Sequence, residues 1–246
     1  MTDAALFISD LHLTPERPLP VRLFYRFIRE VAPHAQALYV LGDFLEAWVG
    51  DDALLEPFYR DLATALKSLS EQGVLLFFLP GNRDFLVGPS FSNATGLTLL
   101  PDPSRIDLFG MPTLLTHGDQ FCTDDVAYQD FRRQVRDPVW QQHFLAQPLQ
   151  QRLELAKALR ERSEHAKADK KPAIMDVNGE AIRAMLAIEA LSQPIRRIIH
   201  GHTHRPARHE HELNGQSVER WVLPDWYESG GYLACDAGGC RLLDFP

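Results

Sequence analysis

The 246-residue chain has no long hydrophobic run. Its longest purely apolar stretch, residues 74–79, is far shorter than the ~20 residues that a membrane-spanning helix needs. The amino terminus has neither a basic segment nor a long apolar one, so we expect no signal peptide. We therefore predict a cytoplasmic protein, and peripheral contact with a membrane stays open.

Cysteine is also scarce. The chain has three, Cys122, Cys235 and Cys240, and no Cys-x-x-Cys pair. An odd number without such pairs argues against a disulfide framework and against a zinc site made of thiolates. We expect free thiols, for which a reducing compartment is the simplest setting.

Excess positive charge is missing as well. The chain carries 25 Lys and Arg against 33 Asp and Glu, a formal net charge of -8. A net-acidic protein is not a general nucleic-acid binder by charge, although a local basic patch can still bind phosphate. We expect neither a nucleic-acid partner nor an obligate protein partner.

The chain contains no internal repeat or low-complexity segment, and short β-type runs alternate with helical patterns. Such alternation predicts a layered α/β fold in a single domain spanning residues 1–246. Strands are expected at 5–9, 37–41, 74–79, 113–116 and 197–199, and helices at 21–31 and 54–69. Asn214-Gly215 predicts a tight hairpin turn, and Gly238-Gly239 is a candidate for another.

Residues 124–171 differ from the rest because their pattern is helical throughout. Between residues 132 and 171 the chain has ten Lys or Arg and five Asp or Glu, a local charge of +5. We predict a helical insertion over the sheet. Two interpretations of its charge stay open: an ordinary solvated helix face, and a surface that binds phosphate.

Five short polar motifs each follow directly after a predicted strand. Strand ends are where an α/β sheet collects its catalytic groups. A glycine opens or precedes several of these motifs and lets the backbone turn sharply after the strand. The motifs are Asp10-x-His12, Gly42-Asp43, Gly81-Asn82-Arg83-Asp84, His117-Gly118-Asp119 and Gly201-His202-Thr203-His204.

The spacing within the motifs has a physical reason. Residues i and i+2 of an extended segment point to the same side, so Asp10 and His12 can hold one metal ion together. One or both of His202 and His204 can bind a metal ion in the same way. Alone, an Asp-x-His or Gly-Asp pair is more often a turn or a cap. Five motifs in order, each at a strand end, argue strongly against chance. His209 and His211 belong to no motif and are expected on the surface.

Seven side chains of the motifs are candidate metal ligands, too many for one ion. With one bridging carboxylate they fit two ions about 3.5–4 Å apart, which polarise a phosphoryl group and activate a water. Imidazole, carboxylate and amide donors suit manganese, iron, cobalt or zinc and argue against calcium. The candidates are Asp10, His12, Asp43, Asn82, His117, His202 and His204.

The five motifs resemble those of the calcineurin-like metallophosphoesterase superfamily, from Asp10 to His204. The resemblance implies a four-layer fold, a β-sandwich of two mixed sheets flanked by helices, with a dimetal site at the strand ends. It implies Asp43 as the bridge. In addition to Asp43, one ion would bind Asp10, His12 and His204. The other would bind Asn82, His117 and His202.

One position departs from the superfamily pattern. The third motif usually reads Gly-Asn-His-Asp, and Arg83 stands here in place of the histidine. Arginine cannot act as a general acid near pH 7, but its fork can clamp a phosphate. This substitution suits a substrate with a good leaving group or with additional phosphate charge.

Residues 41–52, 81–86, 117–125 and 199–206 are similar to signatures of the UDP-2,3-diacylglucosamine pyrophosphatase family of lipid A biosynthesis. That resemblance implies hydrolysis of UDP-2,3-diacylglucosamine to UMP and 2,3-diacylglucosamine 1-phosphate (lipid X), with manganese as the usual metal. It implies peripheral association with the anionic cytoplasmic face of the inner membrane. It also implies that the insertion forms a lid over the acyl chains.

The same resemblance implies roles for particular residues. The catalytic residues would be Asp43, Asn82, Arg83 and His202. The substrate contacts would be Asn82, Arg83, Asp125, Arg160, Ser163, Lys167, Lys170 and His202. Lys167 stands where some members have a polar residue such as asparagine, which weakens that assignment.

Two other hypotheses stay open at this point. The motifs alone fit a dimetal phosphoesterase that acts on nucleotides, dinucleoside polyphosphates or nucleic acid, and a non-catalytic scaffold would keep the same fold. The insertion distinguishes the first of these, because its apolar residues, Leu145 and Leu153 among them, suit acyl chains. An amphipathic helix packed on the core would have the same pattern.

Overall fold

The computed structural model describes residues 3–168, 176–189, 191–192, 194–213 and 215–246, and of residues 161–168 and 213 only the backbone. Eleven strands form two mixed sheets in these parts of the chain. The first has the order β11-β10-β1-β2-β3-β4: Gly239–Phe245, Gly230–Asp236, Ala5–Ile8, Ala37–Val40, Leu75–Phe78 and Thr98–Leu99. The second has the order β5-β6-β7-β9-β8: Ser104–Leu108, Met111–Leu115, Arg197–His200, Gln216–Val222 and Ala207–Leu213.

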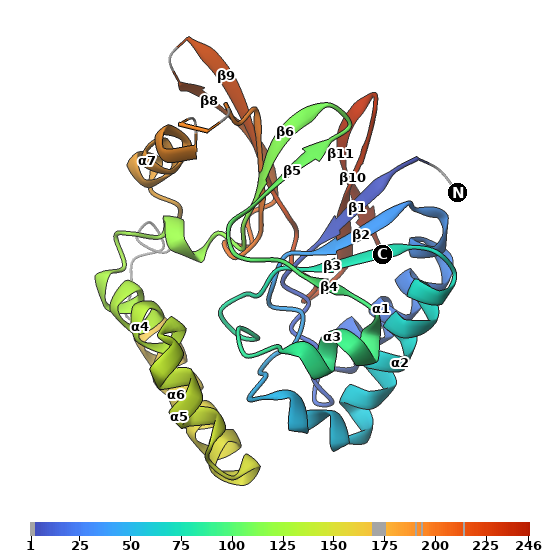
Figure 1. Cartoon of the computed structure of the whole chain (residues 1–246), viewed down its shortest axis with the longest axis vertical. Coiled ribbons are helices and arrows are strands. Elements are labelled where there is room, and N and C mark those ends of the chain that lie inside the picture. Colours follow the sequence, from blue (N-terminus) through green and yellow to red (C-terminus); the bar gives the residue numbers. More distant parts are fainter. Residues whose placement is uncertain (1–2, 169–175, 190, 193, 214) are drawn as a thin grey trace.

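The sheets form the inner layers of a four-layer sandwich (Figure 1). Apolar side chains such as Phe7 and Ile199 fill the space between them. Helices α1, α2 and α3 (Pro18–Glu30, Pro57–Glu71 and Pro89–Thr95) cover the first sheet, and α7 (Gly179–Glu189) covers the second. The predicted fold is confirmed.

Strand direction explains why the motifs gather at one edge of the molecule. β1, β2 and β3 are parallel neighbours in the first sheet, and β6 and β7 are parallel neighbours in the second. β1 and β7 are buried along their whole length, as expected for parallel strands covered on both faces. All five predicted strands exist, and a motif follows each of them.

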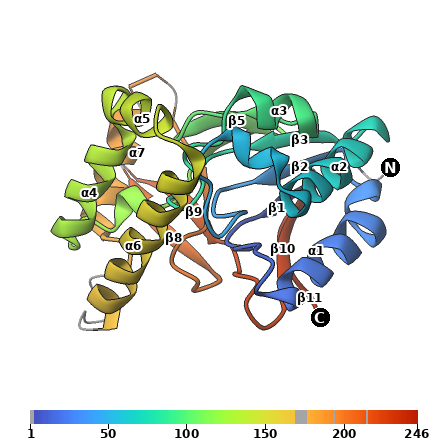
Figure 2. The same cartoon turned by 90° about the horizontal axis from the view of Figure 1, so that it is seen from below.

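The predicted helical stretch forms α4 (Val126–Arg136), α5 (Pro138–Leu145) and α6 (Leu149–Ala168). Figure 2 shows these helices together at one side of the sandwich. Phe144 is buried in the main core, whereas Leu145 and Leu153 stay partly exposed. The insertion therefore packs on the core through one apolar face and leaves other apolar residues accessible. In the described parts of the chain, no helix is long and apolar enough to cross a membrane.

The cysteines differ from the expectation of free thiols. Cys235 and Cys240 form a disulfide, while Cys122 keeps its thiol and is buried. The register of the β10–β11 hairpin places Cys235 opposite Cys240, with the Cα atoms 4.1 Å apart. Counting cysteines missed this pair because it depends on hairpin register.

Both predicted hairpins are present. Leu213 pairs with Gln216, so residues 214–215 connect β8 and β9 as expected, although Asn214 lies outside the described residues. In the second hairpin Asp236 pairs with Gly239, so the turn is 237–238. It lies one residue earlier than predicted, because Gly239 already belongs to β11.

Candidate active site

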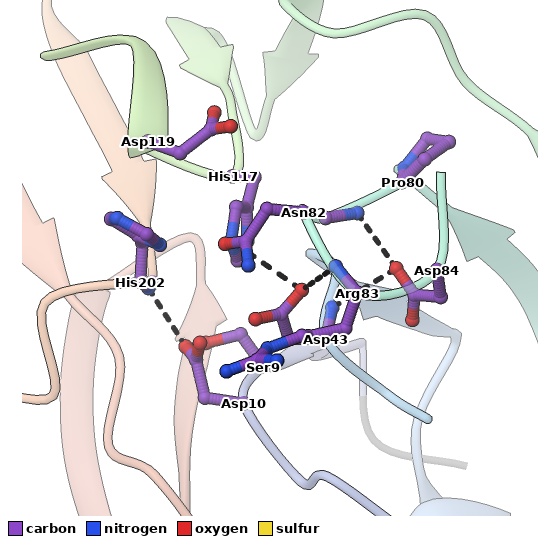
Figure 3. A network of polar contacts seen from close by, with 12 residues as sticks. Ser9, Asp10, Asp43, Pro80, Asn82, Arg83, Asp84, His117, Asp119 and His202 are labelled. Carbon is purple, nitrogen blue, oxygen red and sulfur yellow. Dashed lines mark hydrogen bonds and ion pairs between the residues drawn. The ribbon is translucent and has the colours of Figure 1, made fainter. Parts of the chain in front are cut away.

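Two groups of donor side chains lie at the strand ends. The first donor group is Asp10, His12 and His204, and the second is Asp43, His117 and His202. Within each group the donor atoms lie within 4.8 Å of one another. Figure 3 shows four of these side chains, Asp10, Asp43, His117 and His202, close together with Asn82.

The backbone of these loops is left-handed, which overturns part of the reasoning from sequence. Asp10 and His12 have φ of 55° and 50°, so they meet on one side of a turn and not along an extended segment. Non-glycine residues adopt such angles at a cost of ~1 kcal/mol or more each, mainly at functional sites. Three further donors share this conformation: Asp43, His202 and His204.

Glycines allow the loops to approach one another closely. Gly42 has φ 86°, and a Cβ there would lie 2.5 Å from the Cα of Gly81. A Cβ on Gly81 would collide with Asp43, and one on Gly201 with Asp10. Of these three glycines only Gly42 has the positive φ of a sharp turn. Gly81 and Gly201 are needed because a side chain at either position would collide with a neighbouring loop.

Asp84 joins the second and third motifs. Its buried carboxylate accepts hydrogen bonds from the backbone N–H groups of Gly81 at 2.8 Å and Phe44 at 2.8 Å. It accepts two more from Asp43 at 3.2 Å and Leu45 at 3.3 Å. One side chain therefore fixes the backbone of residues 43–45 and joins it to Gly81.

Asp43 faces both donor groups. Its carboxylate oxygens lie 3.8 Å from His12 Nε2 and 3.7 Å from His117 Nε2. Its Oδ1 also accepts the backbone N–H of Arg83 at 2.8 Å (Figure 3). Asn82 belongs beside the second donor group, because its Oδ1 lies 3.0 Å from His117 Nε2.

Burial and mutual proximity shift the pKa values of these groups. Burial raises the pKa of Asp43 to about 7, against the effect of His117. Burial would lower the pKa of His117, but the carboxylates of Asp43 and Asp10 outweigh it and raise that pKa to about 9. Burial and His117 lower the pKa of His202 to about 3, which keeps its imidazole neutral. A metal ion binds neutral imidazole and ionised carboxylate, so His202 is ready to bind one, whereas His117 must first release its proton.

The donor set fits two divalent ions. Nε2 of His12 is buried and has no hydrogen-bond partner among the described residues, which a coordinated ion would account for, while Nδ1 lies near Glu46. Such a pair of ions supplies Lewis acidity toward a phosphoryl group and lowers the pKa of water at neutral pH. Asp43 lies where two ions could share it, and Asn82 and the histidines would be the further ligands of each ion.

Arg83 follows Asn82 and lies beside Asp43 in Figure 3. Its backbone N–H, and not its side chain, makes the bond to Asp43. The bond that supports Asp43 therefore does not depend on the half-buried guanidinium.

Arg160, a predicted substrate contact, forms an ion pair with Glu46. Its Nη2 lies 3.2 Å from Glu46 Oε1, and Arg17 Nη1 lies 3.4 Å from Glu46 Oε2. The same Oε2 lies 3.5 Å from His12 Nδ1. Glu46 is only 4% exposed and was not singled out from sequence. The only available signal was its place two residues after Phe44 in a motif-rich run.

The other predicted substrate contacts are less defined. Asp125 is buried and caps α4, with Oδ1 accepting the backbone N–H of Tyr128 at 3.1 Å. Ser163 and Lys167 lie in the part of α6, residues 161–168, of which only the backbone is described. Lys170 lies outside the described residues.

Helix α4 contacts the second donor group through residues that sequence reasoning missed. Tyr128 stacks on His202 with ring centroids 5.9 Å apart and donates to Asp119 Oδ2 at 2.7 Å. Arg132 Nε donates to the same oxygen at 2.8 Å. Asp119 belongs to the fourth motif, but its partners lie on the insertion, so only the fold reveals their role.

The fold and the two donor groups define a metal-dependent phosphoesterase, and comparison with known proteins agrees. Residues 5–206 match the family model described as calcineurin-like phosphoesterase. The chain is 50% identical to the UDP-2,3-diacylglucosamine hydrolase of Aromatoleum aromaticum over 96% of this chain and 94% of that protein. It is 48% identical to that of Stenotrophomonas maltophilia K279a, over 96% of each chain, and 48% identical to that of Azotobacter vinelandii, over 98% of each. The chain belongs to the calcineurin-like phosphoesterases and, within them, to the family of these hydrolases.

Proposed function

We propose that the chain hydrolyses the diphosphate bond of UDP-2,3-diacylglucosamine and releases UMP and 2,3-diacylglucosamine 1-phosphate. The observation that carries this proposal is the near full-length similarity to relatives of that name, combined with a complete double donor group. The expected ions are manganese, because it is the usual metal of the family that the motifs resemble; the mixed nitrogen and oxygen donors also suit iron, cobalt or zinc. The ligands are Asp10, His12, Asp43, Asn82, His117, His202 and His204.

Arg83, Asn82 and His202 act on the diphosphate in this proposal. Arg83 binds a phosphate oxygen through its guanidinium, because its backbone already serves Asp43. Asn82 and His202 hold the second ion and face the reacting phosphorus. Asp43, shared between the ions, keeps them close enough to act on the same group.

Helices α4, α5 and α6 form the lid of the substrate site. Partly exposed Leu145 and Leu153 supply an apolar surface for acyl chains. Asp125, Arg160, Ser163, Lys167 and Lys170 contact the sugar and its phosphate. A lipid substrate of this kind brings the chain to the anionic cytoplasmic face of the inner membrane, where the basic insertion favours binding.

The test is hydrolysis of UDP-2,3-diacylglucosamine in detergent with added manganese, in parallel with bis-p-nitrophenyl phosphate and a diadenosine polyphosphate. We expect rapid and selective release of UMP. Hydrolysis of the generic ester or the dinucleotide alone, with the lipid substrate left intact, would contradict the proposed substrate and favour a nucleotide phosphoesterase. Absence of bound or bindable metal would contradict the site itself.

A further inference from the structure

A cleft of about 350 Å³ lies beside the last motif, between the start of β8, β9 and the segment that precedes α7. Asp176, Thr203, Arg205, His209 and Arg220 contribute to its lining. Its volume is within the roughly 300–1,000 Å³ of small-molecule sites. None of the roles assigned above uses this cleft.

The cleft adjoins the opening of the metal site. Thr203, which lines it, stands between His202 and His204, and these two are the partly exposed members of the donor groups. The other four donors are buried. Solvent therefore reaches the donor groups along the same loop that forms one wall of the cleft. A substrate with its phosphate at the metal site can extend one end into the cleft.

Arg220 gives the cleft a buried positive charge. The residue is 5% exposed, and its guanidinium contacts His200 Nε2 at 2.9 Å and His211 Nε2 at 3.0 Å. His200 Nδ1 lies 2.9 Å from the carbonyl of Gly201, so its proton is on Nδ1 and Nε2 is the acceptor for Arg220. Among the described residues no carboxylate is within ion-pair distance of Arg220. A buried cation with neutral partners favours a ligand that is rich in acceptor atoms.

A second pair of charges lies at the same cleft. Asp176 forms an ion pair with Arg205, and both side chains are partly exposed. The lining therefore presents two guanidinium groups and one carboxylate, a net charge of +1 if the histidines are neutral. In chemical terms this is one acceptor together with donors from two arginines. The uracil edge offers the complementary groups, one N–H and two carbonyl oxygens.

We propose that this cleft binds the uridine of a uridine nucleotide, with Asp176 accepting the N–H of the base and Arg205 and Arg220 donating to its carbonyl oxygens. The proposal rests on the proposed function, which requires a site for the nucleotide half of the substrate. The lid and the cleft then hold opposite ends of one molecule, with the diphosphate at the metal site between them.

The test is calorimetric binding of UMP and CMP to the manganese-loaded full chain. Cytosine has a bare acceptor nitrogen where uracil has its N–H, so we expect UMP to bind about tenfold more tightly than CMP. Arg205→Ala should weaken UMP binding by about tenfold. Arg208→Ala is the matched control, because Arg208 is equally exposed on β8 but pairs with Glu210 and Glu219.

Ala207→Trp provides a second variant that fills the cleft without removing a charge. It should weaken UMP binding and raise the KM for UDP-2,3-diacylglucosamine, while turnover of bis-p-nitrophenyl phosphate stays unchanged. The proposal is overturned if both cleft variants bind UMP as tightly as wild type, or if wild type binds UMP and CMP equally. If wild type and variants differ in UMP binding as expected but the lipid substrate is not hydrolysed, the cleft assignment stands and the proposed function fails.

Discussion

The carboxylate of Glu46 lies 3.2 Å from the guanidinium of Arg160 and thereby connects helix α6 to the metal site. The other carboxylate oxygen of Glu46, Oε2, lies 3.5 Å from Nδ1 of His12. A carboxylate beside Nδ1 would orient the imidazole and leave Nε2 to bind an ion. One buried residue therefore links a ligand of the first donor group to the insertion.

We expect Glu46→Gln to weaken manganese binding by roughly 10–100-fold, the usual effect of losing a partner of a metal-bound histidine. The amide keeps the shape of the side chain but loses the charge that Arg160 and Arg17 contact. Amide hydrogen exchange in α6 should become faster, because its anchor is weaker. The measurements are calorimetric manganese titration and hydrogen-exchange mass spectrometry.

Glu154→Gln is the control for this prediction, because Glu154 is an exposed residue of α6 that contacts only Gln150 among the described residues. It should leave both quantities unchanged. Unaltered manganese affinity in Glu46→Gln would show that His12 needs no support from this carboxylate.

Asp84 provides a test of stability. Asp84→Ala leaves four backbone N–H groups without their acceptor, and an orphaned buried donor costs about 1–3 kcal/mol. With partial rescue by water we expect a loss of at least about 3 kcal/mol, which lowers the Tm by roughly 6–12 °C in a chain of this size. Asp107→Ala, which removes the acceptor for the single N–H of Gly110 in an exposed turn, should change the Tm little. Equal shifts in the two variants would contradict this role of Asp84.

The comparison of sequence and structure shows which features are local. Asp10, His12, Asp43 and the later motifs could be found because each follows a strand, and strand ends of parallel neighbours meet in space. The structure brings these side chains together, although not through the extended Asp10-x-His12 segment that was expected. The chain geometry that matters is the left-handed turn, which sequence spacing does not encode.

The features that sequence missed depend on contacts between distant segments. Glu46 acquires its role from Arg160, which is supplied by another helix, and Asp119 from Tyr128 and Arg132. His211, expected on the surface, is half-buried against Arg220 because β8 and β9 pair in one particular register. Pairings of this kind arise from tertiary packing, and no short motif announces them.

Cys122 provides a test of burial. Burial, followed by the nearby Asp119 carboxylate, raises the pKa of its thiol to about 12. Only the thiolate reacts with alkylating reagents, so at pH 8 we expect iodoacetamide to modify native protein about 10³–10⁴ times more slowly than protein in urea. Mass spectrometry of the modified peptide gives both rates.

The sign of the accompanying pH effect follows from the same shift. The folded chain keeps the Cys122 proton up to about pH 12, whereas an unfolded chain loses it near 8.5. The unfolded state therefore binds fewer protons between these values, and the stability contributed by this group declines as the pH rises above about 8.5. Rapid alkylation of native Cys122 at pH 8 would contradict the raised pKa.

Asp43 tests whether one carboxylate is shared by two ions. Asp43→Ala removes a carboxylate that lies beside a histidine of each donor group, so we expect bound manganese to fall at both groups and hydrolysis to drop to background. Metal content by inductively coupled plasma mass spectrometry checks the first expectation and UMP release the second. Asp130→Ala, an exposed residue of α4, is the control. Loss of only one ion per chain would show that Asp43 belongs to a single ion.

Arg83 separates metal binding from phosphate binding. Because its backbone N–H makes the bond to Asp43, Arg83→Ala keeps that bond and should leave the manganese content intact. Loss of the guanidinium removes a charged donor to the phosphate, so we expect kcat to fall by roughly 10²–10³-fold. Arg83→Lys should recover only part of this, because an ammonium group cannot bind two phosphate oxygens in one plane. The measurements are metal analysis and steady-state kinetics on wild type, Arg83→Ala and Arg83→Lys. Loss of manganese from Arg83→Ala would show that Arg83 supports the metal site and does not act on the substrate.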